Sequence, residues 1–404
     1  MEYGGSLALD PPAPKDEVNI IAALKRPDRI SSINLTVTTS LLDKFELCAV
    51  EGPFLELEDL ILLSQDSVPL TPPISFRWGP RLRRLHLTRI AFPGLLRLLY
   101  SSRNLVDLRL RQAFNSSYCP IEGLTDALSR MPQLQSLSLH FPATSDNVFP
   151  PPPLDQRAVL PALICVDFRG TAKHLERLVL RIDAPRLREI QVALFDKSVF
   201  DLSRLGNFID RIGMHKSHYQ ARILFSERAI TISFTRPGPL TCLKLRLLSE
   251  VLSEQLSTVF RTLPHSAKIF NVEDLRISVT RPPNREDSLS SRRWSKFINS
   301  FTCIKWLHLD GNSSTDLVRA LQDAHLQHKT VPPALHKLYL PHPGPHHLPL
   351  SEAVVLFMTS RGRSGYPIGV EYERLYHISE QRGTGTSLCT ALLQGLYYML
   401  TDLK

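Results

Sequence analysis

The sequence predicts an α/β solenoid, in which short parallel strands and helical crossovers alternate along a right-handed array. Leucine is in excess, at 67 of 404 residues, above the level of an ordinary globular domain. A short pattern, Leu-x-x-Leu-x-Leu with conservative replacements, recurs eleven times at intervals mostly of 23 to 32 residues. An amphipathic stretch usually follows each copy. Together these features predict an irregular leucine-rich-repeat fold, with an ordinary pair of α/β domains as the alternative.

The strands are predicted at the end of each copy of the pattern. In Leu85-His86-Leu87, for example, apolar and polar residues alternate, as expected for a strand with one buried face. The copies begin at Ile30, Leu57, Leu82, Leu105, Leu134, Leu163, Leu187, Leu240, Val272, Ile304 and Leu335. Because one repeat cannot bury its apolar face alone, the repeats are expected to stack, with the parallel strands on the concave face.

Helices are predicted behind the strands, on amphipathic stretches that begin at Pro93, Glu122, His174, Leu202, Leu247 and Thr315. The interval from Leu187 to Leu240 is doubled, and the two β-rich runs within it predict an inserted hairpin near 221–235. Residues 141–160 and 281–294, and the tract PHPGPHHLPL after Leu340, are predicted to be loops because they are rich in Pro, Ser, His or charge.

Three parts follow from this pattern. Residues 1–28 are predicted to be an N-terminal extension or capping segment, 29–375 the solenoid, and 376–404 a tail that forms a helix. The tail is interpreted as a docked cap or as an artefact of the gene model, and less readily as a membrane anchor. No signal peptide and no apolar run of about 18 residues is present, so a cytoplasmic or nuclear location is expected.

No catalytic or cofactor motif stands out, and we expect neither an enzyme nor a bound cofactor. The six cysteines are too widely spaced for a zinc knuckle, and core thiols are expected. The glycines of RGTGTS at Arg382 lack the Lys-Ser/Thr ending of a phosphate loop. A metal site is not predicted either, because the histidines at 325, 328, 336, 342, 346 and 347 lack a Cys or acidic partner at ligand spacing.

Function is expected on the strand side chains that point away from the core. The predicted partner-binding residues are Arg84, His86, Asp107, Arg109, Arg111, Asp167, Arg169, Arg276, Trp306, His308 and Tyr339. Arg, Trp and Tyr dominate interface energetics, and a basic stretch is expected near Arg84, Arg109 and Arg111. The alternative at each position is a solvated sheet residue. The net charge of +9 is dispersed over nearly every repeat, which disfavours nucleic-acid binding.

The chain also resembles a known family over residues 15–375. VNIIAALKRPDRISSINL from Val18, PRLRRLHLTRIAFPGLLRLLYSSRNLVDLRL from Pro80, RIDAPRLREIQVALFDKSVFDLSRLGNFIDR from Arg181 and SGYPIGVEYER from Ser364 are similar to segments of the basidiomycete (mushroom) F-box/leucine-rich-repeat-like proteins. The resemblance implies a non-enzymatic protein-recognition module, the substrate-receptor-like part of an SCF ubiquitin-ligase adaptor.

The residues before Ile30 depart from the family pattern, because they contain no Leu-Pro-x-Glu type F-box motif. Skp1 is therefore expected as a partner only if an F-box is supplied upstream. The remaining alternatives are a diverged or truncated paralogue without a ligase role and, less favoured, a nucleic-acid-binding or ligand-binding protein. No membrane interaction is expected, and the partner protein itself is unidentified.

Overall fold

A sheet of 14 strands runs through the part of the chain that the computed structural model describes. That part comprises residues 14–38, 40–42, 54–65, 80–90, 94–112, 119–141, 157–195, 202–211, 218–226, 229–235, 241–248, 271–279, 294, 297–298, 301–311, 314–326, 334–341 and 348–373. All of them belong to one compact unit, Pro11–Glu373. The tail helix predicted within 376–404 lies outside the described residues.

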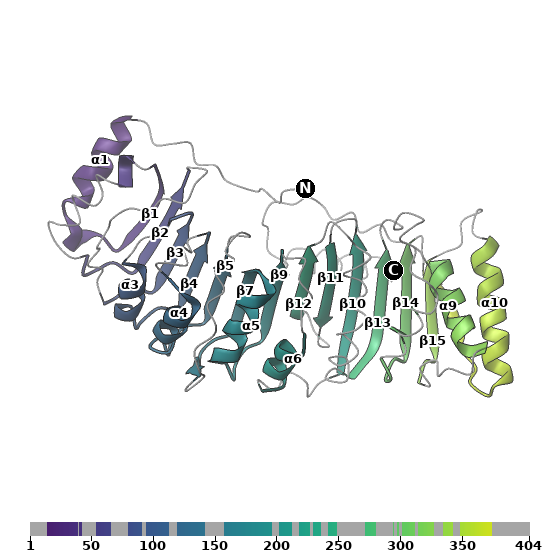
Figure 1. The fold of residues 1–404 in the computed structure, drawn as a ribbon. Coiled ribbons are helices and arrows are strands. Elements are labelled where there is room, and N and C mark those ends of the chain that lie inside the picture. The colour runs from purple at the N-terminus through teal and green to yellow at the C-terminus, as the bar shows by residue number, and fades with distance from the viewer. Residues whose placement is uncertain are drawn as a thin grey trace, which may run out of the picture. The chain divides into compact units, whose positions relative to one another are not determined.

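The strands follow chain order except in one place (Figure 1). In spatial order they are β1 (Ser32–Val37), β2 (Asp59–Ser64), β3 (Arg84–Thr88), β4 (Asp107–Arg111), β5 (Ser136–His140), β7 (Cys165–Gly170), β9 (Glu189–Leu194), β12 (Thr241–Leu248), β11 (Ala229–Thr235), β10 (His218–Ser226), β13 (Asn271–Val279), β14 (Trp306–Gly311), β15 (Lys337–Pro341) and β16 (Gly369–Glu373). A separate pair is formed by β6 (Ala158–Val159) and β8 (Ile182–Asp183). Every one of the eleven sequence patterns forms or enters a strand, which confirms the predicted repeat.

Helices lie between the strands along the chain. They are α1 (Pro14–Leu24), α3 (Leu95–Ser101), α4 (Ile121–Leu128), α5 (Ala172–Arg181), α6 (Leu202–Arg211), α9 (Ser314–Leu326) and α10 (Leu348–Arg363), with a 3-10 turn at Pro27–Arg29. Helices α3, α4, α5 and α6 pack in succession along one face of the sheet, and α9 packs on α10 (Figure 1). Within the described residues, none of these helices is both long and apolar enough to cross a bilayer.

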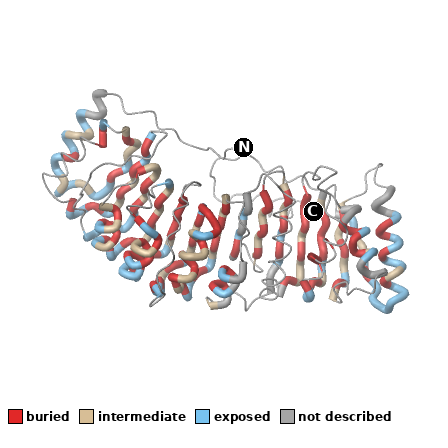
Figure 2. Tube along the Cα trace, viewed as in Figure 1, coloured by how far each residue is buried: buried red, intermediate tan, exposed pale blue. Residues whose placement is uncertain are grey.

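The core lies between the strands and these helices (Figure 2). Along each strand buried and more exposed residues alternate; in β4, Leu108 and Leu110 are fully buried while Asp107, Arg109 and Arg111 are half-buried. The helices contribute a matching apolar stripe that includes Leu98, Leu124 and Leu175, all of which are buried. The leucines therefore form one continuous core, as the solenoid prediction requires.

A ladder of shared carbonyls holds neighbouring repeats in register. The carbonyl oxygen of Glu58 accepts hydrogen bonds from the amides of Arg83 and Arg84, at 2.7 and 3.0 Å. The carbonyl of Arg83 does the same for Val106 and Asp107 in the next repeat, at 2.8 and 3.1 Å. The same two-to-one pattern recurs at the carbonyls of Val106, Gln135, Ile164 and Lys305. Since each strand start is fixed by the repeat before it, the strands stay aligned over a long stretch of sheet.

The inserted hairpin is the exception to the parallel order. Strands β10 and β11 pair antiparallel with Ser226 opposite Ala229, which confirms the hairpin predicted near 221–235. The insertion also includes a third strand, because β12 pairs antiparallel with β11 and parallel with β9. The chain thus leaves β9, forms β10 three places away, and returns through β11 and β12 to fill the gap.

Three local predictions were wrong in whole or in part. Leu247 and Leu248 end strand β12 instead of starting a helix, because their neighbours in register lie on β11; the rest of that predicted helix is outside the described residues. The tract after Leu340 was predicted as loop throughout, yet Leu348 begins helix α10, with a proline in its first turn, where its missing amide costs no hydrogen bond. Of the predicted loop 141–160, Ala158 and Val159 form a short strand.

Two adjacent leucines of β2 test the orientation of the strands. Leu62 is 2% exposed in the core, whereas Leu63 is 36% exposed on the opposite face. We expect Leu62→Ala to lower the free energy of unfolding by about 2 to 5 kcal/mol, because it leaves a cavity between repeats. Leu63→Ala, the matched control, should cost less than about 1 kcal/mol. Urea unfolding followed by circular dichroism measures both, and equal losses would contradict the assigned facing.

Candidate functional site

The open face of the sheet is the surface made by the strand side chains that alternate with the buried apolar ones. The residues predicted to bind a partner all lie on it: Arg84 and His86 on β3, Asp107, Arg109 and Arg111 on β4, Asp167 and Arg169 on β7, Arg276 on β13, Trp306 and His308 on β14, and Tyr339 on β15. They form two groups, because β9, β12, β11 and β10 lie between β7 and β13.

One row of these side chains crosses all 14 strands in unbroken register, and we call it the central row. Neighbouring strands are about 4.8 Å apart, so successive side chains are within reach of one another. In spatial order the central row is Asn34, Ile61, His86, Arg109, Ser138, Asp167, Gln191, Lys244, Ser233, Arg222, Arg276, His308, Tyr339 and Glu371.

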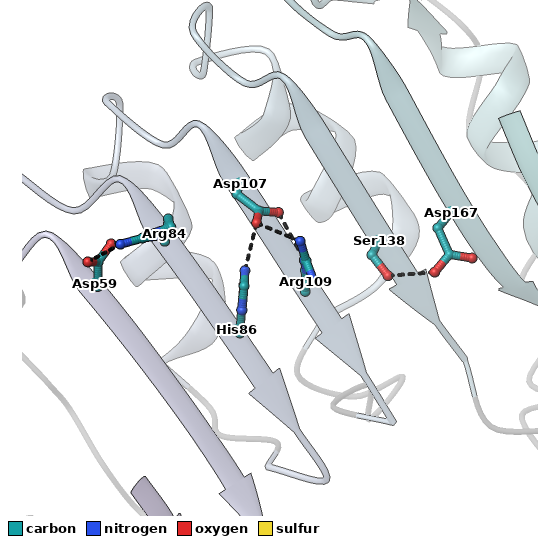
Figure 3. Close-up of polar contacts among 7 residues, drawn as sticks. All are labelled: Asp59, Arg84, His86, Asp107, Arg109, Ser138 and Asp167. Atoms are coloured by element: carbon teal, nitrogen blue, oxygen red, sulfur yellow. Dashed lines mark hydrogen bonds and ion pairs between the residues drawn. The ribbon is translucent and has the colours of Figure 1, made fainter. Parts of the chain in front are cut away.

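Ion pairs connect the first group of predicted residues across three strands (Figure 3). The Arg84 guanidinium pairs with Asp59 on the preceding strand. The Asp107 carboxylate accepts from His86 Nε2 at 2.8 Å and lies 3.0 Å from Arg109 Nη2. Asp59 was not among the predicted residues, since nothing in the local sequence shows that it lies in register with Arg84.

Asp107 is the centre of this network. Burial raises the pKa of its carboxyl, but the hydrogen bonds and charges of His86 and Arg109 outweigh the burial and hold the pKa at about 2. The carboxylate is therefore ionised at neutral pH. Its contacts fix the His86 ring and the Arg109 side chain, so this part of the open face is preorganised.

Ser138, His140 and Asp167 form a second cluster on β5 and β7 (Figure 3 shows the Ser138–Asp167 contact). Ser138 Oγ donates to Asp167 Oδ2 at 3.0 Å, and His140 Nε2 lies 2.9 Å from the same oxygen. The residue types are those of a hydrolytic triad, but the geometry is not. In a catalytic relay the two imidazole nitrogens serve different partners; here Nε2 faces the carboxylate and is also the nitrogen 3.4 Å from the serine oxygen.

Burial decides the charge of this cluster. It lowers the pKa of His140 in spite of the nearby Asp167 carboxylate, so the imidazole is neutral at neutral pH. Burial raises the pKa of Asp167, but hydrogen bonds from His140 and Ser138 and the nearby charges lower it further than burial raises it. The cluster is thus a neutral donor pair around one carboxylate, which suits structural stabilisation more than proton transfer.

The second group of predicted residues lies around His308. Its Nε2 is 3.3 Å from Asp274, its Nδ1 is 3.4 Å from Arg276 Nη2, and its ring stacks on Tyr339 with centroids 4.1 Å apart. The Lys337 ammonium lies over the Tyr339 ring, 5.5 Å from its centroid. Trp306 is 40% exposed beside them. The structure therefore places Arg276, Trp306, His308 and Tyr339 close together on the open face.

The expected basic stretch near Arg84, Arg109 and Arg111 is not a region of excess positive charge. Within β1–β9 the open face carries equal numbers of arginines and carboxylates, namely Arg84, Arg109, Arg111 and Arg169 against Asp59, Asp107, Asp167 and Glu189. Three of the four arginines contact a carboxylate. Arg111 is the exception: its Nε has no hydrogen-bond partner and burial lowers its pKa.

Unpaired positive charge lies instead on the inserted strands. Lys244, Arg246 and Arg222 are exposed on the open face. The sequence predicted their strands, but these residues were not selected as partner-binding. Ser138, His140 and Asp274 also lie on the open face and were not among the predicted residues. The alternation of apolar and polar residues in LTCLKL is the signal that identifies Lys244.

The cysteines and histidines add no reactive site within the described residues. Burial raises the pKa of the Cys119 thiol to about 12 and, together with nearby carboxylates, that of Cys165 to about 11, so both are neutral thiols. Core thiols were expected throughout, but of the three described cysteines only Cys119 is buried, whereas Cys165 is half-buried on the open face and Cys303 is exposed. No group of three potential metal ligands is found in the part of the chain that the structure describes. His336 is exposed there, and the histidines at 328, 342, 346 and 347 lie outside it.

No family model matches the chain, and no curated protein matches it. Among solved structures it is similar to the leucine-rich repeat-containing protein LegL7 from Legionella pneumophila, with 12% sequence identity and a TM-score of 0.31 over 86% of this chain and 96% of that one. The repeat architecture rests on the sheet topology and core of the chain itself.

The pH dependence of stability tests the state of His140. Its pKa is lowered on folding, so the unfolded chain binds more protons below the ordinary histidine pKa of about 6.5. The contribution of His140 is therefore fully present above that pH and is lost as the pH falls towards the lower folded-state value. We expect His140→Gln to reduce the loss of unfolding free energy between about pH 7.5 and about pH 5.5. Urea titrations at both pH values measure it, and an unchanged or larger loss in the variant would contradict the buried neutral imidazole.

Proposed function

We propose that this chain is a non-enzymatic protein-recognition module that binds a partner protein through the open face of its sheet. One observation supports this above all: the central row places polar, charged and aromatic side chains in unbroken register over every strand except β2, which contributes Ile61, on the face opposite the apolar core. Stacked repeats use such extended surfaces to bind proteins. Much of the surface is held in place by its own hydrogen bonds, which lowers the entropy lost on binding.

The contact network also argues for recognition in preference to catalysis. The two carboxylates best placed for acid–base chemistry, Asp107 and Asp167, have their pKa values lowered by fixed partners and remain ionised. A general acid or base needs a pKa near the working pH. Fixed charges of both signs suit selection among protein surfaces, since a partner must match the pattern.

The more specific proposal is that the module is the substrate-receptor part of an F-box type adaptor of an SCF ubiquitin ligase. Its support is the resemblance over residues 15–375 to the basidiomycete F-box/leucine-rich-repeat-like proteins. In this proposal the open face binds the substrate, and Skp1 binds only through an F-box supplied ahead of the repeats.

Alanine variants on the two faces test the recognition surface. A partner captured from the native cell and then purified should bind the Arg109→Ala/Trp306→Ala variant at least about tenfold more weakly than the wild type, because Arg and Trp anchor interfaces. The matched control, Arg97→Ala/Arg363→Ala, changes exposed residues of helices α3 and α10. It should change the dissociation constant less than about twofold. Calorimetry measures both, and the reverse order would contradict the proposal.

A fusion tests the adaptor role. The 404-residue chain should not bind purified Skp1, whereas a fusion with an F-box ahead of Met1 should bind Skp1 and support ubiquitylation of the captured partner in a reconstituted ligase. Arg109→Ala/Trp306→Ala in the fusion should lower the ubiquitylation rate by about the factor by which it weakens partner binding. Two results would contradict this role: Skp1 binding by the unfused chain, or an equal ubiquitylation rate with and without the Arg109→Ala/Trp306→Ala change.

A further inference from the structure

The inserted strands β12, β11 and β10, with β13 beside them, carry a cluster of cations that we call the basic patch. It consists of Lys244 and Arg246 on β12, Arg222 on β10 and Arg276 on β13. The first three are exposed, and no carboxylate pairs with them among the described residues. Arg276 differs, because His308 orients its guanidinium at 3.4 Å.

The strand register makes the cations of the basic patch close neighbours. Arg222 and Arg276 are direct partners in register, and only Ser233 separates Arg222 from Lys244 along the central row. Like charges directly opposite each other on a sheet are destabilising. On β1–β9 the same problem is solved by alternating arginines with carboxylates, as Asp59, Arg84 and Asp107 show in one row. Among the described residues, Lys244, Arg246 and Arg222 have no such compensation, because the one open-face carboxylate on these four strands, Asp274, pairs with His308. This local excess of positive charge is complementary to an anionic ligand.

The dimensions of the patch limit its ligand. From β12 to β13 there are three strand-to-strand steps, or about 14 Å. An extended peptide covers about 3.3 Å per residue, so about four residues span this distance. Ser233 and Thr231, between the cations of β12 and β10, are short and half-buried, and they leave the charged groups accessible while offering hydroxyl groups to a ligand.

An apolar contact point lies one strand beyond. Trp306 on β14 is in register with Asp274 on β13 and is 40% exposed. A large exposed aromatic side chain at the edge of a charged patch is typical of an interface anchor. A segment that crosses the patch along the central row would reach Trp306 one or two residues after its last acidic side chain.

The surroundings favour a protein segment over a nucleic acid. A nucleic acid presents a long run of phosphates and needs cations along its whole path. Beyond the patch on one side, Gln191 and Asp167 continue the central row, and on the other His308, Tyr339 and Glu371 do. Tyr339 already stacks on His308, so within the described residues it offers little room for stacking bases. A polyanion longer than the patch would meet neutral or acidic side chains at both ends.

We infer that the basic patch binds an acidic, extended segment of the partner protein, about four Glu or Asp residues long, followed by an apolar residue that contacts Trp306. This inference rests on the proposed function and names the chemistry of the partner at that face. The bound carboxylates neutralise Lys244, Arg222 and Arg246 and relieve their mutual repulsion, so ionic strength weakens the complex.

The direct test uses a fluorescein-labelled peptide with four consecutive Glu residues followed by Gly and Phe. Fluorescence anisotropy at about 50 mM salt should show binding that weakens at least about tenfold when the Glu residues are replaced by Gln, and again at about 300 mM salt. Lys244→Glu/Arg222→Glu/Arg246→Glu should weaken it by at least the same factor. The control Arg97→Glu/Lys173→Glu/Arg363→Glu changes the net charge equally at exposed helix positions and should leave it within about twofold.

Several outcomes would overturn the inference. They are equal binding of the Glu and Gln peptides, equal loss in the control variant, or tighter binding of an oligothymidylate of the same charge, which would identify the patch as a nucleic-acid site. If the Glu variant is misfolded by circular dichroism, Lys244→Gln/Arg222→Gln/Arg246→Gln takes its place, with an expected loss of about fivefold or more.

The native partner separates this inference from the proposed function. A partner that is lost in the Arg109→Ala/Trp306→Ala variant but fully retained in the Lys244→Glu/Arg222→Glu/Arg246→Glu variant would sink the acidic-segment inference and leave the recognition module standing. A partner that binds both variants as tightly as the wild type would overturn both the proposed function and the acidic-segment inference. Weakening by both sets, at least about tenfold each, is the expected result.

Discussion

The stacking of one repeat on the next is the constraint on which the whole structure depends. Each repeat presents apolar strand residues that its neighbours cover, and at seven of the described strands the start is held by a carbonyl of the preceding repeat that accepts two amide hydrogen bonds. The stacking of repeats therefore both buries the leucines and completes the backbone hydrogen bonds at the strand starts. A fixed register follows, and with it a fixed position for every second side chain on the other face.

Because the register is fixed, opposite charges from neighbouring strands lie side by side on the open face. Where strands are parallel and regularly spaced, arginines and carboxylates from different repeats neutralise each other, and Asp107 and Asp167 hold their histidine and arginine partners in place. On the inserted strands the cations Lys244, Arg246 and Arg222 have no carboxylate partner among the described residues, and charge pairing resumes beyond them, at His308–Asp274 and Lys337–Glu371. In the proposed function, the neutral, preorganised strands provide general complementarity and the inserted strands bind a strongly charged feature of the partner.

Local sequence patterns predicted the strands well because each Leu-x-x-Leu-x-Leu copy carries both its period and its buried face. They failed where a neighbour decided the outcome. Leu247 and Leu248 fit an amphipathic helix by themselves but pair with β11, and the first turn of α10 was hidden in a tract whose prolines and histidines indicate a loop. For the site, sequence alternation placed the predicted residues on one face but did not reveal that Asp59 neutralises Arg84 or that β12 carries Lys244 into the same row as Arg222.

The sequence by itself determined the repeat, its strands and the set of side chains that point away from the core, because period and alternation are properties of nearest neighbours in the chain. Only the tertiary structure decided which of these side chains meet. Residues 21 to 32 positions apart, such as His86 with Asp107 and Ser278 with Asp310, become partners through strand register. Register depends on the length of every crossover and on the path of the insertion, and no local pattern encodes it. The excess positive charge was therefore visible in the composition, while its place on the inserted strands was not.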